Sequence, residues 1–180
     1  MEIQILNAIQ NIHTSWLDAS MIGITKLGNH GLIWFGLTLV LLINPKTRKI
    51  GIMCTLALII DLIGCNLVLK HFFARPRPYM VNPNVHLLIP EVGDHSSFPS
   101  GHTAMAFTIA SVFYLNKFKG WQIIGIFAIL IAFSRLYLYV HFPTDVLAGI
   151  LIGIGCGILG VKIYQSKRQT NERFVSFILG

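Results

Sequence analysis

Residues 133–145 read F-S-R-L-Y-L-Y-V-H-F-P-T-D, and an apolar run ends there in polar groups that a membrane interior tolerates only where they have a function. Ser134 and Arg135 lie near the end of the apolar run. His141 follows after five residues, and Asp145 comes four positions later, just past Pro143. The stretch therefore brings an arginine, an imidazole and a carboxylate to one edge of an apolar segment.

The composition indicates an integral membrane protein. Of the 180 residues, 54% are hydrophobic and only 12% are charged, which is too apolar for a soluble domain of this size. A helix needs about 20 apolar residues to cross a membrane, so six crossings would take about 120 residues and leave only short loops. We therefore predict one membrane domain over 1–180, an all-α, polytopic six-helix bundle. The formal net charge of +7 does not indicate nucleic acid, because the basic residues fall between apolar segments, where membrane lipids are the expected partners.

The apolar runs predict where the chain crosses. Residues 1 to about 12 alternate apolar and polar positions with helical spacing and predict a short interfacial helix. The first predicted crossing is short, carries Asp18 and has the least certain boundaries. One long loop, 71–98, and a basic cytoplasmic tail, 165–180, complete the chain. The predicted crossings are about 15–27, 32–43, 50–69, 99–115, 121–140 and 144–164.

The basic residues predict the orientation, because lysine and arginine accumulate on cytoplasmic loops. The loops at 46–49 and 117–119 and the chain from 162 onward are basic and share one side, which we predict to be the cytoplasm. The localisation predicted is the plasma membrane. Lys70, Arg77 and Arg135 lie on the opposite, extracytoplasmic side, where cations need a chemical reason.

Three polar clusters meet at this outer edge and suit a phosphate ester. Fixed cations stabilise the charge that a phosphoryl group develops during transfer, most strongly where water is scarce. The start of the fourth crossing adds backbone N–H groups and the positive end of a helix dipole. The clusters are Lys70 with Arg77 and Pro78, then Pro99, Ser100, Gly101 and His102, and then Ser134, Arg135, His141 and Asp145.

The two histidines supply the chemistry. A neutral imidazole can attack phosphorus, and a second histidine can protonate the departing oxygen and later activate water. We assign His141 as the nucleophile, because Asp145 could hold one of its ring nitrogens, and His102 as the acid and base. Since three protein cations do the electrostatic work, neither a metal nor a cofactor is expected.

These motifs resemble the type 2 phosphatidic acid phosphatase superfamily. Its patterns K-x6-R-P, P-S-G-H and S-R-x5-H-x3-D are matched from Lys70 to Asp145 without a gap or substitution. The resemblance implies a six-span enzyme that hydrolyses a lipid phosphate or diphosphate without metal, through a phosphohistidine on His141. It implies phosphate binding by Lys70, Arg77, Ser100, Gly101 and Arg135, with Pro78, Pro99 and Ser134 in support.

The substrate is less defined than the chemistry. Undecaprenyl diphosphate is favoured, because the small six-span form and outward site are similar to those of bacterial undecaprenyl diphosphate phosphatases. The long loop with Arg75 and its histidines could also contact a second phosphate. Phosphatidylglycerophosphate and phosphatidic acid are alternatives, and the motifs do not separate a diphosphate from a monoester. A non-catalytic lipid-phosphate binder or transporter is the alternative of another class, although binding alone would not need His102, His141 and Asp145.

Two further features concern packing. Gly149, Gly153 and Gly157 recur every four residues and predict close approach of another helix, within the bundle or in a dimer, so the oligomeric state stays open. Asp61 lies inside the third predicted crossing, where a carboxylate is costly. We expect it to face the bundle in a structural pairing, and the sequence assigns no role to Arg75 beyond a loop charge or headgroup contact.

Overall fold

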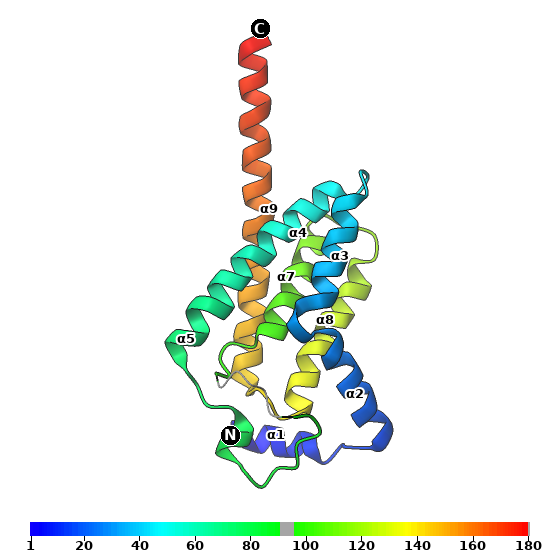
Figure 1. The fold of residues 1–180 in the computed structure, drawn as a ribbon, viewed down its shortest axis with the longest axis vertical. Coiled ribbons are helices and arrows are strands. Elements are labelled where there is room, and N and C mark those ends of the chain that lie inside the picture. The colour runs from blue at the N-terminus through cyan, green and yellow to red at the C-terminus, as the bar shows by residue number, and fades with distance from the viewer. Residues whose placement is uncertain (91–95, 180) are drawn as a thin grey trace.

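The computed structural model describes residues 1–90 and 96–179, with side chains for all of these except 30 and 171–179. Asp94 and His95 of the predicted loop lie outside the described residues. Every regular element in the described ranges is helical, which confirms the all-α prediction (Figure 1). The elements are α1 (Glu2–Gln10), α2 (Ser15–Leu27), η1 (Asn29–Gly31), α3 (Leu32–Ile43), α4 (Arg48–Asp61), η2 (Leu62–Leu69), α5 (Lys70–Phe73), α6 (Pro78–Val81), α7 (Gly101–Leu115), α8 (Trp121–Tyr137) and α9 (Pro143–Leu179).

The six separate crossings are not confirmed. Arg48–Val81 and Pro143–Thr170 are long and apolar enough to cross a membrane, whereas α7 and α8 are shorter apolar helices. The predicted first and second crossings correspond to α2 and α3, which are bent by 51° and are long enough only as a pair. Figure 1 shows that together they lead from one end of the bundle to the other. With 13 and 12 residues, each is shorter than the roughly 20 residues that a complete crossing needs.

The N-terminal helix α1 forms as predicted, but its apolar face packs on protein. Leu6 is fully buried, and Ile3 and Ile9 pack against the same cluster, to which the turn after α8 contributes Leu138 and Val140. Figure 1 shows α1 running across the end of the bundle where α8 ends and α9 begins. The helix therefore covers this end of the protein.

The glycines of α9 pack against α7. A Cβ atom at Gly149 would lie 2.7 Å from the backbone oxygen of Ser100, and one at Gly157 would lie 2.6 Å from Cβ of Ser111. At Gly153 the nearest atom is likewise a backbone oxygen of α7. The predicted close approach is confirmed and lies within the bundle. Beyond the predicted end near residue 164, α9 continues into the basic tail as one helix.

Asp61 faces the interior, as predicted, and is fully buried at the end of α4. Neither of its carboxylate oxygens has a hydrogen-bond partner within the part of the chain that the structure describes. The structural pairing predicted for Asp61 is therefore not found there.

Candidate active site

The N-terminus of α7 is built to receive an anion. Ser100 is the N-cap, so the helix begins two residues after Pro99, where the sequence predicted its start. The N–H of Ala104 donates to the Ser100 carbonyl at 2.9 Å, and the N–H groups of residues 101–103 therefore precede the helical hydrogen-bond ladder. Gly101 leaves room here for the side chain of Asn66, whose Oδ1 would lie 2.7 Å from an added Cβ atom.

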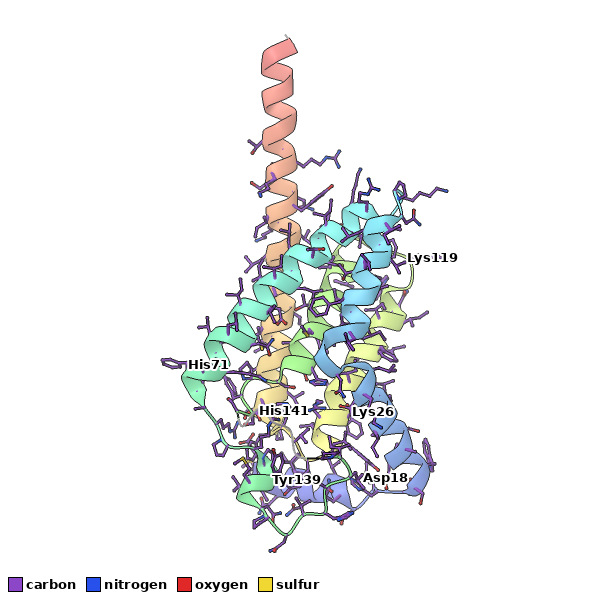
Figure 2. All side chains as sticks on the ribbon, viewed as in Figure 1. Asp18, Lys26, His71, Lys119, Tyr139 and His141 are labelled. Atoms are coloured by element: carbon purple, nitrogen blue, oxygen red, sulfur yellow. The ribbon has the colours of Figure 1, made fainter. Side chains whose placement is uncertain are left out.

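A cavity of about 820 Å³ opens at this helix end. All three predicted clusters contribute to its wall, although they are far apart in sequence. Tyr139 and His141 lie at the end of the bundle where α1 runs, and Lys119 lies at the opposite end (Figure 2). The predicted site residues that line the cavity are Lys70, Arg77, Gly101, His102, Arg135 and His141. Two others, Ser100 and Asp145, are fully buried beside it.

Hydrogen bonding fixes the tautomer of His141. Its Nδ1 lies 2.7 Å from the backbone oxygen of Ser97, which can only accept, so Nδ1 carries the proton. Nε2 therefore keeps its lone pair, and it lies 3.4 Å from the guanidinium of Arg77. The carboxylate of Asp145 is 3.7 Å from Nδ1, longer than a hydrogen bond. The direct partner of the ring is thus Ser97, which the motifs did not reveal.

The surroundings keep His141 uncharged. The residue lies in the turn between α8 and α9 and is 2% exposed. Burial and the nearby cations Arg135, Arg77 and Lys70 hold the pKa of His141 well below its ordinary value, although the bond to Ser97 opposes this. A neutral imidazole with an available Nε2 lone pair is the form that can attack phosphorus.

Asp145 holds the turn that carries His141. Its Oδ2 accepts the backbone N–H of Phe142 at 2.8 Å, and its Oδ1 accepts from Arg75 at 2.6 Å. Arg75 also pairs with Glu2 at 2.6 Å. The role predicted for Arg75 was a loop charge or a headgroup contact, yet its guanidinium contacts the carboxylate predicted to orient the nucleophile. These contacts, rather than a second phosphate, occupy Arg75.

Two buried arginines supply positive charge to the cavity. Arg77 is 1% exposed and donates to the Val140 carbonyl at 2.9 Å. Arg135 is 2% exposed, and its NH1 bonds to Oγ1 of Thr25. Its Nε has no hydrogen-bond partner among the described residues. Burying a cation costs several kcal/mol unless its charge is compensated, so two guanidinium groups in this wall favour a bound anion.

The turn between α2 and α3 holds His102. Nε2 of His102 lies 3.1 Å from Oδ1 of Asn29, an acceptor, so this nitrogen donates. A Cβ atom at Gly28 would lie 2.9 Å from the imidazole carbon Cδ2 of His102. Neither Gly28 nor Asn29 belongs to a motif, and the sequence showed them only as a turn. Both come to the site because α2 and α3 bend at this point.

Ser100, which was predicted to bind phosphate, and the predicted supporting residues lie outside the cavity wall. The hydroxyl of Ser100 lies 2.9 Å from that of Thr103, and its N–H donates to the Asp145 carbonyl at 3.1 Å. Ser100 thus joins α7 to α9, and the structure does not place it on the cavity wall. Ser134 bonds within α8 to the Ile131 carbonyl, and Pro78 is the first residue of α6.

A sequence model of the PAP2 superfamily matches residues 48–169, which include all three motifs. The chain belongs to the PAP2 superfamily. It is 36% identical to an undecaprenyl-diphosphatase of Sulfolobus acidocaldarius over 163 residues, which are 89% of this chain and 77% of the relative. The resemblance seen in the motifs is confirmed.

Solved structures agree with the sequence comparison. The structure of Aquifex aeolicus LpxE matches with a TM-score of 0.79 and 38% identity, covering 89% of this chain and 94% of the other. A PAP2-type phosphatidylglycerolphosphate phosphatase from Bacillus subtilis matches with a TM-score of 0.74 and 29% identity, covering 92% and 85%. This PAP2 protein is therefore a membrane hydrolase of the lipid phosphatase class.

An apolar groove continues from the cavity of this PAP2 phosphatase. It has a volume of about 240 Å³ and lies between α3 and α4. Phe35 and Leu62 line both the groove and the cavity, so the two spaces adjoin. The phosphatase thus has a cationic cavity beside an apolar groove, an arrangement that matches a lipid with a phosphorylated head.

Proposed function

We propose that this PAP2 phosphatase hydrolyses undecaprenyl diphosphate at the outer membrane face, without a metal, through a phosphohistidine on His141. The observation that carries the proposal is the position of His141, whose Nε2 lies 3.4 Å from the guanidinium of Arg77 at the wall of the cationic cavity. The N–H groups at the start of α7 and the guanidinium of Arg135 offer further donors for the phosphate oxygens.

The proposed reaction has two steps. Nε2 of His141 attacks the terminal phosphorus, and the bond to the bridging oxygen breaks while His102 gives that oxygen a proton. Undecaprenyl phosphate leaves. His102 then takes a proton from water, whose oxygen attacks the phosphohistidine, and the P–N bond breaks to give inorganic phosphate and restore Nε2. Ser97 and Asp145 stabilise the positive charge that the ring acquires between the steps.

The cavity and the groove beside it support undecaprenyl diphosphate as the substrate. The groove between α3 and α4 would take the start of the polyprenyl chain, while the cavity takes the diphosphate. Lys26 also lines the cavity and adds a cation beyond the three in the motifs, which suits a second phosphate. The similarity to an undecaprenyl-diphosphatase supports this choice. Phosphatidylglycerophosphate is the second candidate, because a structural neighbour is named for that activity, and phosphatidic acid is the third.

Phosphate release from purified protein in detergent, with a chelator present, tests the proposal. Undecaprenyl diphosphate, phosphatidylglycerophosphate and phosphatidic acid form the panel, and we expect the diphosphate to have the highest kcat/KM. His141→Ala should lower kcat by about 10³-fold or more, because it removes the nucleophile. The matched control is His71→Ala, an exposed histidine outside the cavity, which should keep parental activity. A His141→Ala variant as fast as the parent would refute the mechanism, and faster hydrolysis of another lipid would refute the substrate.

A further inference from the structure

The N-terminal helix α1 contacts the catalytic turn through a carboxylate. Oε1 of Glu2 accepts the backbone N–H of Thr144 at 3.1 Å and its hydroxyl at 2.7 Å. Oε2 of Glu2 accepts from Arg75 at 2.6 Å. Although burial opposes it, the bonds from Thr144 and Arg75 hold the pKa of Glu2 below its ordinary value. Glu2 is therefore ionised at neutral pH and pairs with Arg75 as a charge.

Arg75 links this carboxylate to the active site. Its NH1 donates to Oδ1 of Asp145 at 2.6 Å and to the Thr144 hydroxyl at 2.7 Å. Its guanidinium carbon lies 4.0 Å from the ring centroid of Phe142. The planar fork of arginine allows both carboxylates to be held at once, with the ring fixing its plane. The buried Asp145 thus has its positive partner in Arg75.

A second set of contacts holds the other end of the turn. The hydroxyl of Tyr139 donates to Oδ1 of Asn7 at 2.7 Å, and the side chain of Gln10 donates to the Tyr137 carbonyl at 3.1 Å. Tyr139 has φ of +59°, a conformation that a non-glycine residue adopts only when its surroundings enforce it. Contacts from α1 therefore bracket His141 on both sides.

We infer that α1 is a positioning element of the active site, in which Glu2 holds Arg75 and Arg75 holds Asp145 and the turn that carries His141. The inference rests on the proposed role of His141 as nucleophile. None of the three groups in this chain of contacts, Glu2, Arg75 and Asp145, lines the cavity. Arg75 thus acts through Asp145 and not on the substrate.

This arrangement predicts effects on kcat and not on KM. A positioning residue sets the geometry of attack, where small displacements lower the rate, whereas a substrate-binding residue changes KM. We expect Arg75→Gln to lower kcat by about 10- to 100-fold with KM within about twofold of the parent. Arg75→Lys keeps the positive charge but loses the planar guanidinium group, so it should keep part of the activity that Arg75→Gln loses. Glu2→Gln should have a smaller effect in the same direction.

The experiment measures kcat, KM and the unfolding midpoint for Arg75→Gln, Arg75→Lys, Glu2→Gln and the double variant. If the residues act in series, the double variant will be no slower than Arg75→Gln alone, because in Glu2→Gln the amide oxygen can still accept from Thr144 and only the ionic contact with Arg75 is lost. Arg48→Gln is the matched control, since Arg48 is exposed at the opposite end and bonds to the Leu42 carbonyl. It should match the parent.

The outcomes separate the inference from the proposed function. An Arg75→Gln variant with a raised KM and unchanged kcat would overturn the inference and make Arg75 a substrate contact. Parental kcat in Arg75→Gln, or multiplicative losses in the double variant, would also overturn it. In these cases a His141→Ala variant without activity would still support the proposed function. Full activity of His141→Ala would overturn the proposed function itself.

Discussion

At the scale of single residues, the site places the proposed nucleophile, His141, beside a cationic wall. The proton on Nδ1 of His141 is held by a backbone oxygen, and the same ring presents its lone pair beside Arg77. The cations Arg135, Arg77 and Lys70 lower the basicity of the imidazole, and a bound phosphate would offset their charge. In the proposed mechanism the ring therefore remains neutral before the substrate binds and becomes positive only as the P–N bond forms.

The neutral state of His141 predicts how activity depends on pH near the ordinary pKa of histidine. The folded protein holds the pKa of His141 below its ordinary value, so the ring takes up a proton only at a pH well below about 6.5. Because kcat/KM reports the free enzyme, its profile between about pH 5 and 8 should show no loss of activity from His141 near pH 6.5. Measuring the profile with two lipid phosphates whose phosphate groups have different pKa values distinguishes ionisation of the substrate from ionisation of the enzyme. An acid limb near pH 6.5 that appears with both substrates and persists in a His102 variant would contradict this expectation for His141.

At the scale of elements, α7 and α9 form the rigid part of the site. The start of α7 supplies Gly101 and His102, and the start of α9 supplies Asp145. The Ser100 N–H joins the two helix starts through the Asp145 carbonyl. Since the glycine face of α9 allows the backbones to approach, helix packing sets the distance between the two catalytic motifs.

Gly149→Ala tests the link between packing and activity. The added Cβ would lie 2.7 Å from the Ser100 carbonyl and force α7 away from α9. We expect a loss of about 1–3 kcal/mol in the free energy of unfolding and reduced kcat. Gly155→Ala is the matched control on the same helix, since its Cβ would meet nothing within 4 Å. Equal thermal stability and activity of the two variants would show that this contact does not set the site.

At the scale of the whole molecule, the positions of the two ends define the path through the membrane. Both α1 and the catalytic turn lie at one end of the bundle, while the loop between α3 and α4 lies at the other (Figure 1). If α2 and α3 cross together, the chain crosses five times, and α1 stands on the side of the active site. Six separate crossings would instead put α1 on the same side of the membrane as the basic loop between α3 and α4.

Cysteine labelling in intact cells distinguishes these paths. The three native cysteines, Cys54, Cys65 and Cys156, are buried, so a reporter cysteine can be added at an exposed position. We expect a membrane-impermeant maleimide to label Asn11→Cys and to leave Lys46→Cys unlabelled until the membrane is opened. Labelling of both positions from the same side would refute the joint crossing of α2 and α3. A reversed pattern would refute the outward active site.

The sequence by itself determined the all-helical membrane character, the motif residues that meet at the cavity and the glycine face of α9. These features follow from composition, from residue spacing and from the chemical character of individual side chains, none of which depends on how the bundle packs. Only the tertiary structure decided that Ser97 holds His141, that Asn29 holds His102 and that Arg75 joins Glu2 to Asp145. A backbone oxygen has no signature in sequence, and partners such as Glu2 and Thr144 are brought together only when the bundle packs. The bend between α2 and α3 likewise depends on that packing, because two short apolar runs specify helices but not the direction that joins them.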